Sequence, residues 1–195
     1  MTRKEEKQRL RTIIRREECA LGTKYKAASS AAICAHIIAM PEYQNAETVF
    51  CFVGRSHEID THALLARTLA DGKRLCVPLC VDKGIMELRE ITDLSQLICG
   101  SYGIQEPPSD APIISVDDVD LSIIPCLTCD HGGRRLGFGG GYYDRFLSVY
   151  RAAAVLVCRE RLIREELPVE PHDMPVPWVV TENGLYEDGI PAPLV

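Results

Sequence analysis

The chain has 195 residues, of which 46% are hydrophobic, so it can bury one full core and we expect a single domain over residues 1–195. Its formal net charge of −6 argues against a surface built mainly to hold nucleic acid, so any phosphate site must be local. No apolar run approaches the roughly 20 residues that span a bilayer, and the charged N-terminal segment is unlike a signal peptide, which predicts a cytoplasmic protein with no membrane partner.

Two helices and a buried strand are predicted in the first part of the chain. Residues 3–18 show the spacing of an amphipathic helix, with apolar side chains on one side and charges on the remainder. A second helix is expected over 25–40, where Pro41 closes it. The β-rich run 48–53 then predicts a strand that is buried on both faces.

The next segment predicts a β-α-β unit. Asp60 is a good N-cap for a helix that runs to about residue 70, and a second buried strand is expected over 75–79. Residues 86–91 suggest a further strand. The stretch 102–112 is punctuated by glycine and proline and predicts a loop.

Strands and helices continue to alternate in the rest of the chain. A short apolar strand is expected over 121–125, a helix over 142–150 and a strand over 153–158. This alternation favours an α/β fold in three layers with a mainly parallel sheet. The nine cysteines lie mostly inside apolar segments, so no disulfide framework is expected.

The strongest chemical signal is the glycine-rich segment 134–144, between a predicted strand and a predicted helix. Glycines let backbone N–H groups approach phosphate oxygens closely, and a helix start adds the positive end of a dipole. The arginines before the glycines and Asp144 after them favour a polyphosphate cradle over a loop without a ligand. The spacing fits neither a Walker A loop nor a dinucleotide fingerprint, which would need glycine at Tyr142.

Three cations of the first predicted helix share one face. Lys7, Arg11 and Arg15 stand at four-residue intervals, where like charges repel one another. A bound polyanion would relieve this repulsion. The alternative is a solvated surface helix whose glutamates balance the charge.

Two aspartates are candidate magnesium ligands. A Mg²⁺ ion bound with ATP takes one or two carboxylates besides phosphate oxygens and water, and Asp144 and Asp173 are available for this role. The alternatives are a first-turn charge for Asp144 and a turn-forming role for Asp173.

Cys126, Cys129 and His131 have the look of half a zinc site, or of a redox-active Cys-x-x-Cys pair. No second Cys/His pair follows at a suitable spacing. Packing is therefore the favoured interpretation of these side chains.

Five motifs are spread over nearly the whole chain. They are Lys7-x-x-Leu10-Arg11, Glu58-Ile-Asp-Thr61, Tyr102-Gly-Ile-Gln-Glu-Pro107, Asp130-x-x-Gly133-x-Arg135-Leu-Gly-Phe-Gly-Gly-Gly-Tyr-Tyr-Asp144 and Glu170-Pro-His-Asp-Met-Pro175. In this order they resemble the 5-formyltetrahydrofolate cyclo-ligases, also called methenyltetrahydrofolate synthetases.

The resemblance implies a Rossmann-like three-layer α/β/α sandwich, with 5-formyltetrahydrofolate and ATP as ligands, Mg²⁺ as cofactor, and we expect a monomer. It implies that Glu58 holds the folate near its reacting nitrogens and that Asp144 and Asp173 hold the metal. ATP would be contacted by Lys7, Arg11, Arg135, Leu136, Gly137, Phe138, Gly139, Gly140, Gly141, Tyr142 and Tyr143. The folate would be bordered by Phe138, Gly139, Gly140, Gly141 and Tyr142. Catalysis would involve Glu58, Arg135 and Tyr142.

The implied reaction converts 5-formyltetrahydrofolate to 5,10-methenyltetrahydrofolate and ATP to ADP and phosphate. Such chemistry needs mostly positioning and charge neutralisation, which agrees with the lack of an obvious Ser-His-Asp or Cys-His set. Two alternatives stay open: another nucleotide- or sugar-phosphate enzyme on a similar fold, and a small RNA-binding module that uses the basic face of the first helix.

Overall fold

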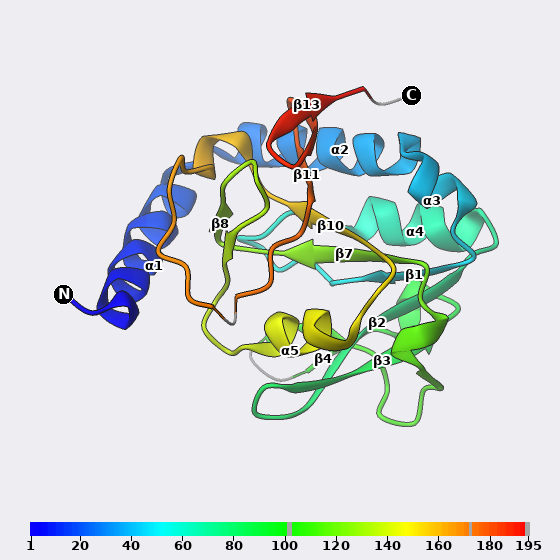
Figure 1. Ribbon diagram of the computed structural model, residues 1–195. Helices are drawn as coiled ribbons and strands as arrows, with labels where there is room; N and C mark the ends of the chain where they lie inside the picture. The colour runs from blue at the N-terminus through cyan, green and yellow to red at the C-terminus, as the bar shows by residue number, and fades with distance from the viewer. Residues whose placement is uncertain (101–102, 172, 194–195) are drawn as a thin grey trace.

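A central sheet of nine strands, in the order β13-β12-β11-β10-β7-β1-β2-β3-β6, organises the protein (Figure 1). The computed structural model describes residues 1–100, 103–171 and 173–193; Tyr102 and His172, which belong to two of the motifs above, lie outside them. The sheet contains β1 (Thr48–Cys51), β2 (Arg74–Asp82), β3 (Ile85–Ile91), β6 (Ile113–Ile114), β7 (Leu121–Pro125), β10 (Ala153–Val157), β11 (Trp178–Thr181), β12 (Gly184–Glu187) and β13 (Ile190–Ala192). Two further pairs are β4 (Ile98–Cys99) with β5 (Gln105–Glu106) and β8 (Thr128–Cys129) with β9 (Arg135–Leu136).

The centre of the sheet is parallel and both edges are antiparallel. Strands β11, β10, β7, β1 and β2 pair in parallel. Strands β12 and β13 extend one edge in antiparallel pairing, and β3 and β6 extend the other. The predicted α/β class with a mainly parallel sheet is confirmed in the five central strands. Strands β6, β11, β12 and β13 escape prediction because each has at most four residues, too few for a hydrophobic period to stand out.

Helices cover both faces of the sheet, which gives three layers. Within β1, Val49 and Cys51 pack into the core formed with α2 and α4, whereas Phe50 packs on the opposite side with α5. Phe50 is fully buried with its ring 5.1 Å from that of Phe146, and burial of such a side chain contributes roughly 1.5–3 kcal/mol. The helices are α1 (Arg3–Ala20), α2 (Thr23–Ala39), α3 (Pro41–Asn45), α4 (His62–Ala70) and α5 (Tyr142–Val149). Among the described residues, no helix is both long and apolar enough to cross a membrane.

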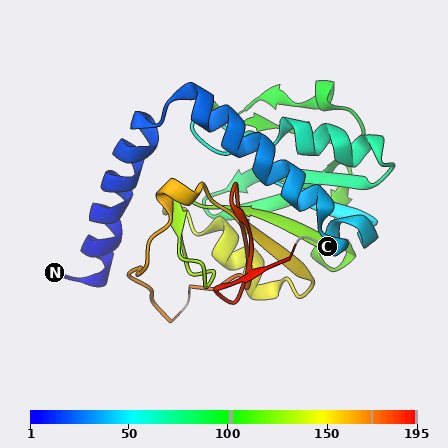
Figure 2. The same cartoon turned by 90° about the horizontal axis from the view of Figure 1, so that it is seen from above.

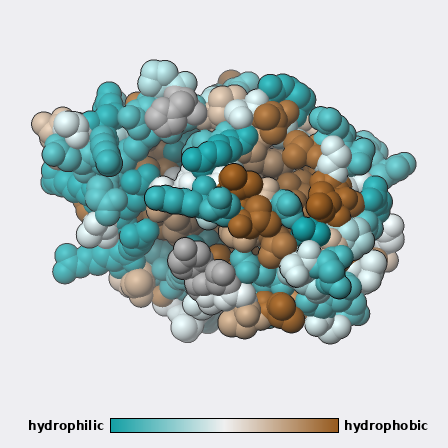
Figure 3. Space-filling model, turned by 90° about the horizontal axis from the view of Figure 1, so that it is seen from below, coloured by the Kyte–Doolittle hydropathy of each residue, from teal (hydrophilic) through white to brown (hydrophobic). Residues whose placement is uncertain are grey.

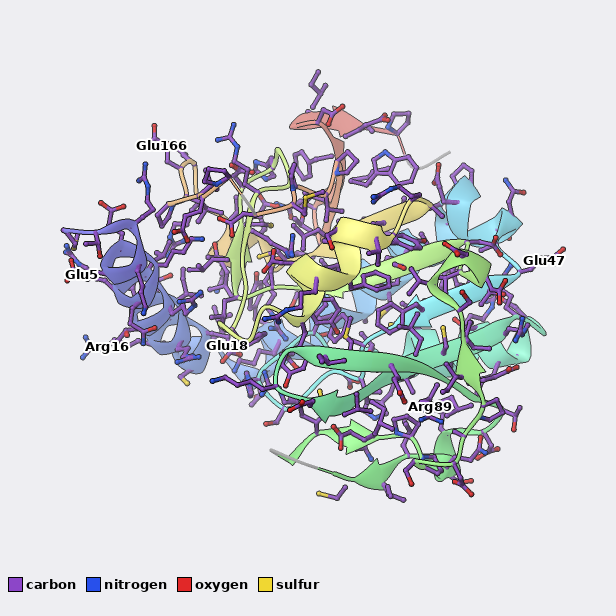
Figure 4. The ribbon with its side chains drawn as sticks, turned by 60° about the horizontal axis from the view of Figure 1, so that its bottom comes forward. Glu5, Arg16, Glu18, Glu47, Arg89 and Glu166 are labelled. Carbon is purple, nitrogen blue, oxygen red and sulfur yellow. The ribbon has the colours of Figure 1, made fainter. Side chains whose placement is uncertain are left out.

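Helix α1 stands at the side of the molecule, apart from α2, which lies across the sheet (Figure 2). The helix begins with a capping box, in which Thr2 and Glu5 each accept a hydrogen bond from the other's backbone N–H. Glu5 and Arg16 lie at the outer edge of the molecule and Glu18 at the inner end of the helix (Figure 4). Ile14 is fully buried, so α1 meets the body of the protein along a narrow face.

Most predicted elements differ from the structure by one to three residues at an end, and three differences have a clear physical reason. Helix α4 begins at His62 with Thr61 as its N-cap, although Asp60 Oδ1 accepts a hydrogen bond from His62 N at 3.0 Å. Pro41 begins a separate short helix, α3, because proline fits the first turn of a helix. The expected loop over 102–112 contains β5, which pairs with β4.

Candidate active site

A cleft of about 580 Å³ opens at the carboxyl ends of the central strands. The chain passes from β1 to its neighbour β2 on one side and from β7 to its neighbour β10 on the other, so the strand order reverses between β1 and β7. In α/β sheets such a switch point leaves a crevice where ligands bind. Phe52 and Val53, after β1, and Pro125, at the end of β7, line the cleft.

The loop after β1 presents Glu58 on a rigid support. Arg55 donates to the Glu58 carboxylate from its backbone N, from Nε and from Nη2, each at 3.0 Å. The buried Arg159 donates from Nη2 to the backbone carbonyl of Glu58 at 2.8 Å. The guanidinium carbon of Arg55 lies 4.6 Å from the ring centroid of Phe138, which joins this loop to the glycine-rich segment.

The β8–β9 hairpin brings Arg135 into the cleft. Its side chain is only 4% exposed, Nη2 lies 2.6 Å from Asp144 Oδ1, and Nη1 donates to the carbonyl of Met174. Gly133 has a positive φ of 79°, and a Cβ atom there would lie 1.7 Å from Val176 O. Glycine at this position therefore lets the segment that carries Met174 pack directly on the hairpin.

The glycine-rich loop turns into α5 at Gly141, the N-cap residue, whose φ of 71° is left-handed. Among the described side chains none caps this helix, so its first N–H groups are available to a ligand in the cleft. Burial raises the pKa of the Tyr143 hydroxyl well above its usual range, and the charge of Glu58 raises it further. Tyr143 therefore stays protonated at neutral pH.

Lys7 of α1 reaches into the charged part of the cleft. It is 7% exposed, and Nζ lies 2.6 Å from Glu170 Oε2 and 2.7 Å from Asp173 Oδ2. Burial by itself lowers the pKa of Lys7, but the hydrogen bonds to Asp173 and Glu170 outweigh it and raise the pKa. Lys7 is therefore not a solvated surface cation, which was the alternative interpretation of the basic face of this helix.

Arg11, one turn further along α1, also faces the glycine-rich loop. Its Nε donates to the carbonyl of Gly137 at 2.9 Å. Burial lowers the pKa of Arg11, and the neighbouring charge of Arg15 lowers it further, although the guanidinium stays protonated at neutral pH. Arg15 itself remains exposed, so the predicted basic stripe divides into two inward residues and one outward residue.

If ATP binds in this cleft, as the resemblance of the motifs implies, Lys7→Ala should reduce kcat/KM for ATP about 10- to 100-fold, because a charge-assisted contact contributes roughly 1.5–3 kcal/mol. The same change should lower the free energy of unfolding by about 1–2 kcal/mol, less than for a fully buried pair because Glu170 is partly exposed. Steady-state kinetics with varied ATP and a melting curve measure both effects. Arg16→Ala, on the outer side of the same helix, is the matched control. Equal kinetics for the two variants would place Lys7 outside the nucleotide site.

Asp144 and Asp173 both line the cleft and offer the hard oxygen donors that Mg²⁺ prefers. Their side chains are 37% and 15% exposed, so a ligand in the cleft can reach them. Each is paired with a cation, Asp144 with Arg135 and Asp173 with Lys7. Both carboxylates therefore offer oxygen donors of the kind that binds Mg²⁺ together with phosphate oxygens.

Another part of the cleft lining is apolar. It comes from the loop after β1, from β2 and β3, from the residue before β5 and from the glycine-rich loop, and includes Phe52, Pro78, Met86, Ile104 and Phe138. The surface seen from below is likewise divided, with hydrophobic side chains at and to the right of its centre and hydrophilic ones to the left (Figure 3). A cleft of this composition suits a ligand with a flat ring at one end and an anionic ligand beside it.

The family model of the 5-formyltetrahydrofolate cyclo-ligases matches residues 3–182. The chain belongs to this family. The 5-formyltetrahydrofolate cyclo-ligase of Escherichia coli (strain K12) is 29% identical over 181 residues, which cover 90% of this chain and 100% of that protein. A probable 5-formyltetrahydrofolate cyclo-ligase of Schizosaccharomyces pombe is 27% identical and covers 90% of this chain and 94% of its own.

Solved structures agree with this membership. The NMR structure of Aquifex aeolicus 5,10-methenyltetrahydrofolate synthetase has a TM-score of 0.83 and 27% sequence identity, over 97% of this chain and 96% of that chain. The resemblance that the motifs carry is thereby confirmed, and so is the assignment to an enzyme family. A synthetase from Mycoplasma pneumoniae, at 17% identity and a TM-score of 0.74, supports the fold.

The fold of this cyclo-ligase family member brings the predicted site residues into the same cleft, namely Lys7, Arg11, Glu58, 135–144 and Asp173. Two contributors were not predicted. Arg55 directly follows Gly54 at the carboxyl end of a central strand, and that position could have suggested it. Arg159 reaches Glu58 from a strand end about a hundred residues further along the chain, and no local pattern reveals such a contact.

Proposed function

We propose that this chain is a 5-formyltetrahydrofolate cyclo-ligase that uses MgATP to form 5,10-methenyltetrahydrofolate in the cleft between β1 and β7. Family membership supports the folate reaction. One observation supports the use of ATP. Lys7, Arg11 and Arg135 line the same cleft as the glycine-rich loop, beside apolar side chains. Phosphate groups and a flat ring would each find matching surfaces there.

The formyl group on N5 of the substrate is an amide-like carbonyl, whose oxygen cannot leave unaided. Transfer of the γ-phosphoryl group of ATP to this oxygen, with departure of ADP, converts it into a phosphate ester. N10 then attacks the formyl carbon and loses its proton. Cleavage of the bond between that carbon and the phosphorylated oxygen releases phosphate and leaves the methenyl bridge between N5 and N10.

The protein contributes position and charge to these steps. Lys7, Arg11 and Arg135 would neutralise the phosphates, and the N–H groups at the start of α5 would bind their oxygens. Glu58, held by Arg55, would orient the folate near N5 and N10. Alignment of reacting groups can contribute about 7–11 kcal/mol to lowering a barrier, so no nucleophilic side chain is required.

Asp144 and Asp173 would hold the magnesium ion. When bound, Mg²⁺ neutralises charge on the phosphate oxygens and orients them for transfer. Asp173 and Asp144 would then leave their ion pairs with Lys7 and Arg135, and the metal would balance their negative charge. The two cations would face the phosphates instead.

The activity can be tested directly with purified protein. Incubation with 5-formyltetrahydrofolate, ATP and Mg²⁺ should produce the absorbance of methenyltetrahydrofolate together with one ADP per product. Omission of either ATP or Mg²⁺ should abolish both signals. ATP-independent turnover, or no turnover under any of these conditions, would refute the proposal.

Asp144→Asn and Asp173→Asn keep side-chain size and remove the charge that a hard cation requires. Each should raise the Mg²⁺ concentration for half-maximal rate by at least about 10-fold, the lower end of what loss of even an outer-shell partner costs. Rates measured across a Mg²⁺ titration check this, with the exposed Asp110→Asn as control. A rate loss that is equal at all Mg²⁺ concentrations would mean that the aspartates only position Lys7 and Arg135.

We further propose that the enzyme acts in the cytoplasm as a monomer.

The alternative of RNA binding through α1 is disfavoured because Lys7 and Arg11 turn toward the cleft. A thermal-shift comparison should give a higher melting temperature with MgATP or 5-formyltetrahydrofolate and no change with RNA.

A further inference from the structure

Three cysteines that the proposed reaction does not use meet beside the cleft. Cys126 follows β7, Cys129 ends β8 and Cys158 follows β10, and their Sγ atoms all lie within 4.8 Å of one another. Cys129 and Cys158 are buried, and Cys126 is half-buried. Among the described residues, these three cysteines are the side chains with metal-binding atoms that cluster closely enough to share one metal ion.

The sheet register explains why Cys158 joins the Cys-x-x-Cys pair. Strands β7 and β10 run in parallel with Pro125 opposite Val157, so the next residue of each strand is a cysteine at the same level. His131, the expected third member of a half zinc site, is directed elsewhere: it stacks on Tyr186 at 4.0 Å, and its Nε2 lies 3.1 Å from Glu160 Oε1. The third sulfur therefore comes from the sheet and not from the neighbouring sequence.

The distances suit a thiolate-bound metal ion. Zinc binds cysteine sulfur at about 2.3 Å, so two sulfurs of a tetrahedral site are about 3.8 Å apart. The three sulfurs need to approach one another by no more than about 1 Å to reach that arrangement, which is within reach of small side-chain rotations. Thiolates are also the ligands that select soft or borderline metals such as Zn²⁺.

A small cavity beside Cys126 and Cys158 leaves room for a fourth ligand. It has a volume of about 20 Å³ and is lined by Cys126 and Cys158 together with His57, Glu58 and Phe138. A water molecule needs roughly 10–15 Å³ of such space, so the cavity can hold one. Three protein ligands and one water complete a tetrahedral zinc site.

The surrounding charges favour the ion with its ligands. Three thiolates and one Zn²⁺ carry a net charge of −1. Arg135 lies opposite Cys129 in the β8–β9 pair, and Arg159 directly follows Cys158. Arg135 is already paired with Asp144, so Arg159 is the buried cation that can balance the excess negative charge.

We propose that Cys126, Cys129 and Cys158 form a binding site for a thiophilic divalent metal ion, with Zn²⁺ as the natural occupant. The ion would tie the carboxyl ends of β7 and β10 together directly behind Glu58 and Phe138. Because Arg159 follows Cys158 and donates to the Glu58 carbonyl, the site would also fix the loop that presents Glu58. The inference rests on the cysteine geometry and is independent of the folate chemistry.

Titration of the reduced, metal-free protein with Co²⁺ tests this site, because tetrahedral cobalt thiolates absorb strongly in the near ultraviolet and visible. One equivalent of Co²⁺ should produce the thiolate-to-cobalt absorption, and Zn²⁺ should displace it. Cys126→Ala and Cys158→Ala should each weaken Co²⁺ binding by more than the roughly 10- to 100-fold that loss of an outer-shell partner costs. A double variant of the exposed cysteines, Cys19→Ser with Cys99→Ser, should bind Co²⁺ as the parent does.

Cys126→Ala is the decisive variant because its side chain is half-buried and its loss threatens folding least. A melting curve for each variant establishes that the fold is retained. Absence of the thiolate absorption in the reduced parent protein would overturn the proposal. So would an unchanged Co²⁺ affinity in a folded Cys126→Ala variant.

Discussion

Arg135→Ala is expected to lower kcat/KM for the ring-closing reaction by about 10³, the low end of what an arginine that neutralises a transferring phosphoryl group contributes. The side chain is almost completely buried in the cleft wall, where a lost charge is poorly replaced by water. Its removal also leaves Asp144 without its cation and the Met174 carbonyl without its donor. The loss should therefore appear in kcat as well as in KM for ATP.

The neighbouring arginine supplies the control for this change. Arg134 has the same chemistry, but its side chain is 58% exposed and lies 3.6 Å from Asp130 Oδ2, so Arg134→Ala should stay within about 2-fold of the parent. Arg135→Lys should recover only part of the activity, because lysine keeps the charge and lacks the planar fork that reaches both Asp144 and Met174. Similar rates for Arg134→Ala and Arg135→Ala in folded proteins would remove Arg135 from the catalytic set.

Glu58→Gln is expected to reduce kcat/KM for 5-formyltetrahydrofolate by about 100-fold, the upper end of the effect of one charge-assisted hydrogen bond. The substitution keeps the size of the side chain, and its amide oxygen can still accept a hydrogen bond from Arg55. ATP affinity should therefore stay nearly constant. Steady-state kinetics with varied folate and calorimetric titration with MgATP measure the two effects separately.

An exposed glutamate outside the cleft lining, Glu166, gives the reference variant Glu166→Gln, which should match the parent in both measurements. If Glu58→Gln loses ATP affinity as strongly as folate turnover, Glu58 belongs to the nucleotide part of the cleft. The contact between Arg55 and Phe138 makes this outcome informative, because it is the link through which Glu58 would act on the glycine-rich loop.

Elements with long apolar runs could be predicted from the sequence, and the shortest strands, most of them at the sheet edges, could not. Strands β1 and β2 follow from continuous hydrophobic stretches and helix α4 from the capping residue before it, and the structure pairs β1 with β2 in parallel as expected. The edge strands β6, β12 and β13 are short and half-exposed, so tertiary pairing and not local pattern decides them. The N-cap of α4 lies one residue later than predicted because Asp60 and Thr61 are both good caps and local signals do not choose between them.

The candidate site divides in the same way. The glycine-rich loop can be predicted because glycines before a helix have a local physical meaning. The burial of Lys7 cannot, since its partners Glu170 and Asp173 stand more than 160 residues away in the chain. The grouping of Cys126, Cys129 and Cys158 likewise depends on the register of two strands that the sequence alone does not align.

The side chains that line the cleft have consequences for the rate at which ligands arrive. Among the described residues, five lining cations (Lys4, Lys7, Arg11, Arg55 and Arg135) are matched by five lining carboxylates (Glu58, Glu106, Asp144, Glu170 and Asp173). With no net charge in its lining, the cleft itself exerts little long-range attraction on MgATP, so we expect diffusion and orientation to govern the encounter. The association rate constant should change by less than about 3-fold between low and physiological ionic strength, whereas electrostatic steering can raise on-rates 10- to 10³-fold. Stopped-flow measurement of MgATP binding at several salt concentrations would test this expectation. A steep fall of the association rate constant with rising salt would contradict it.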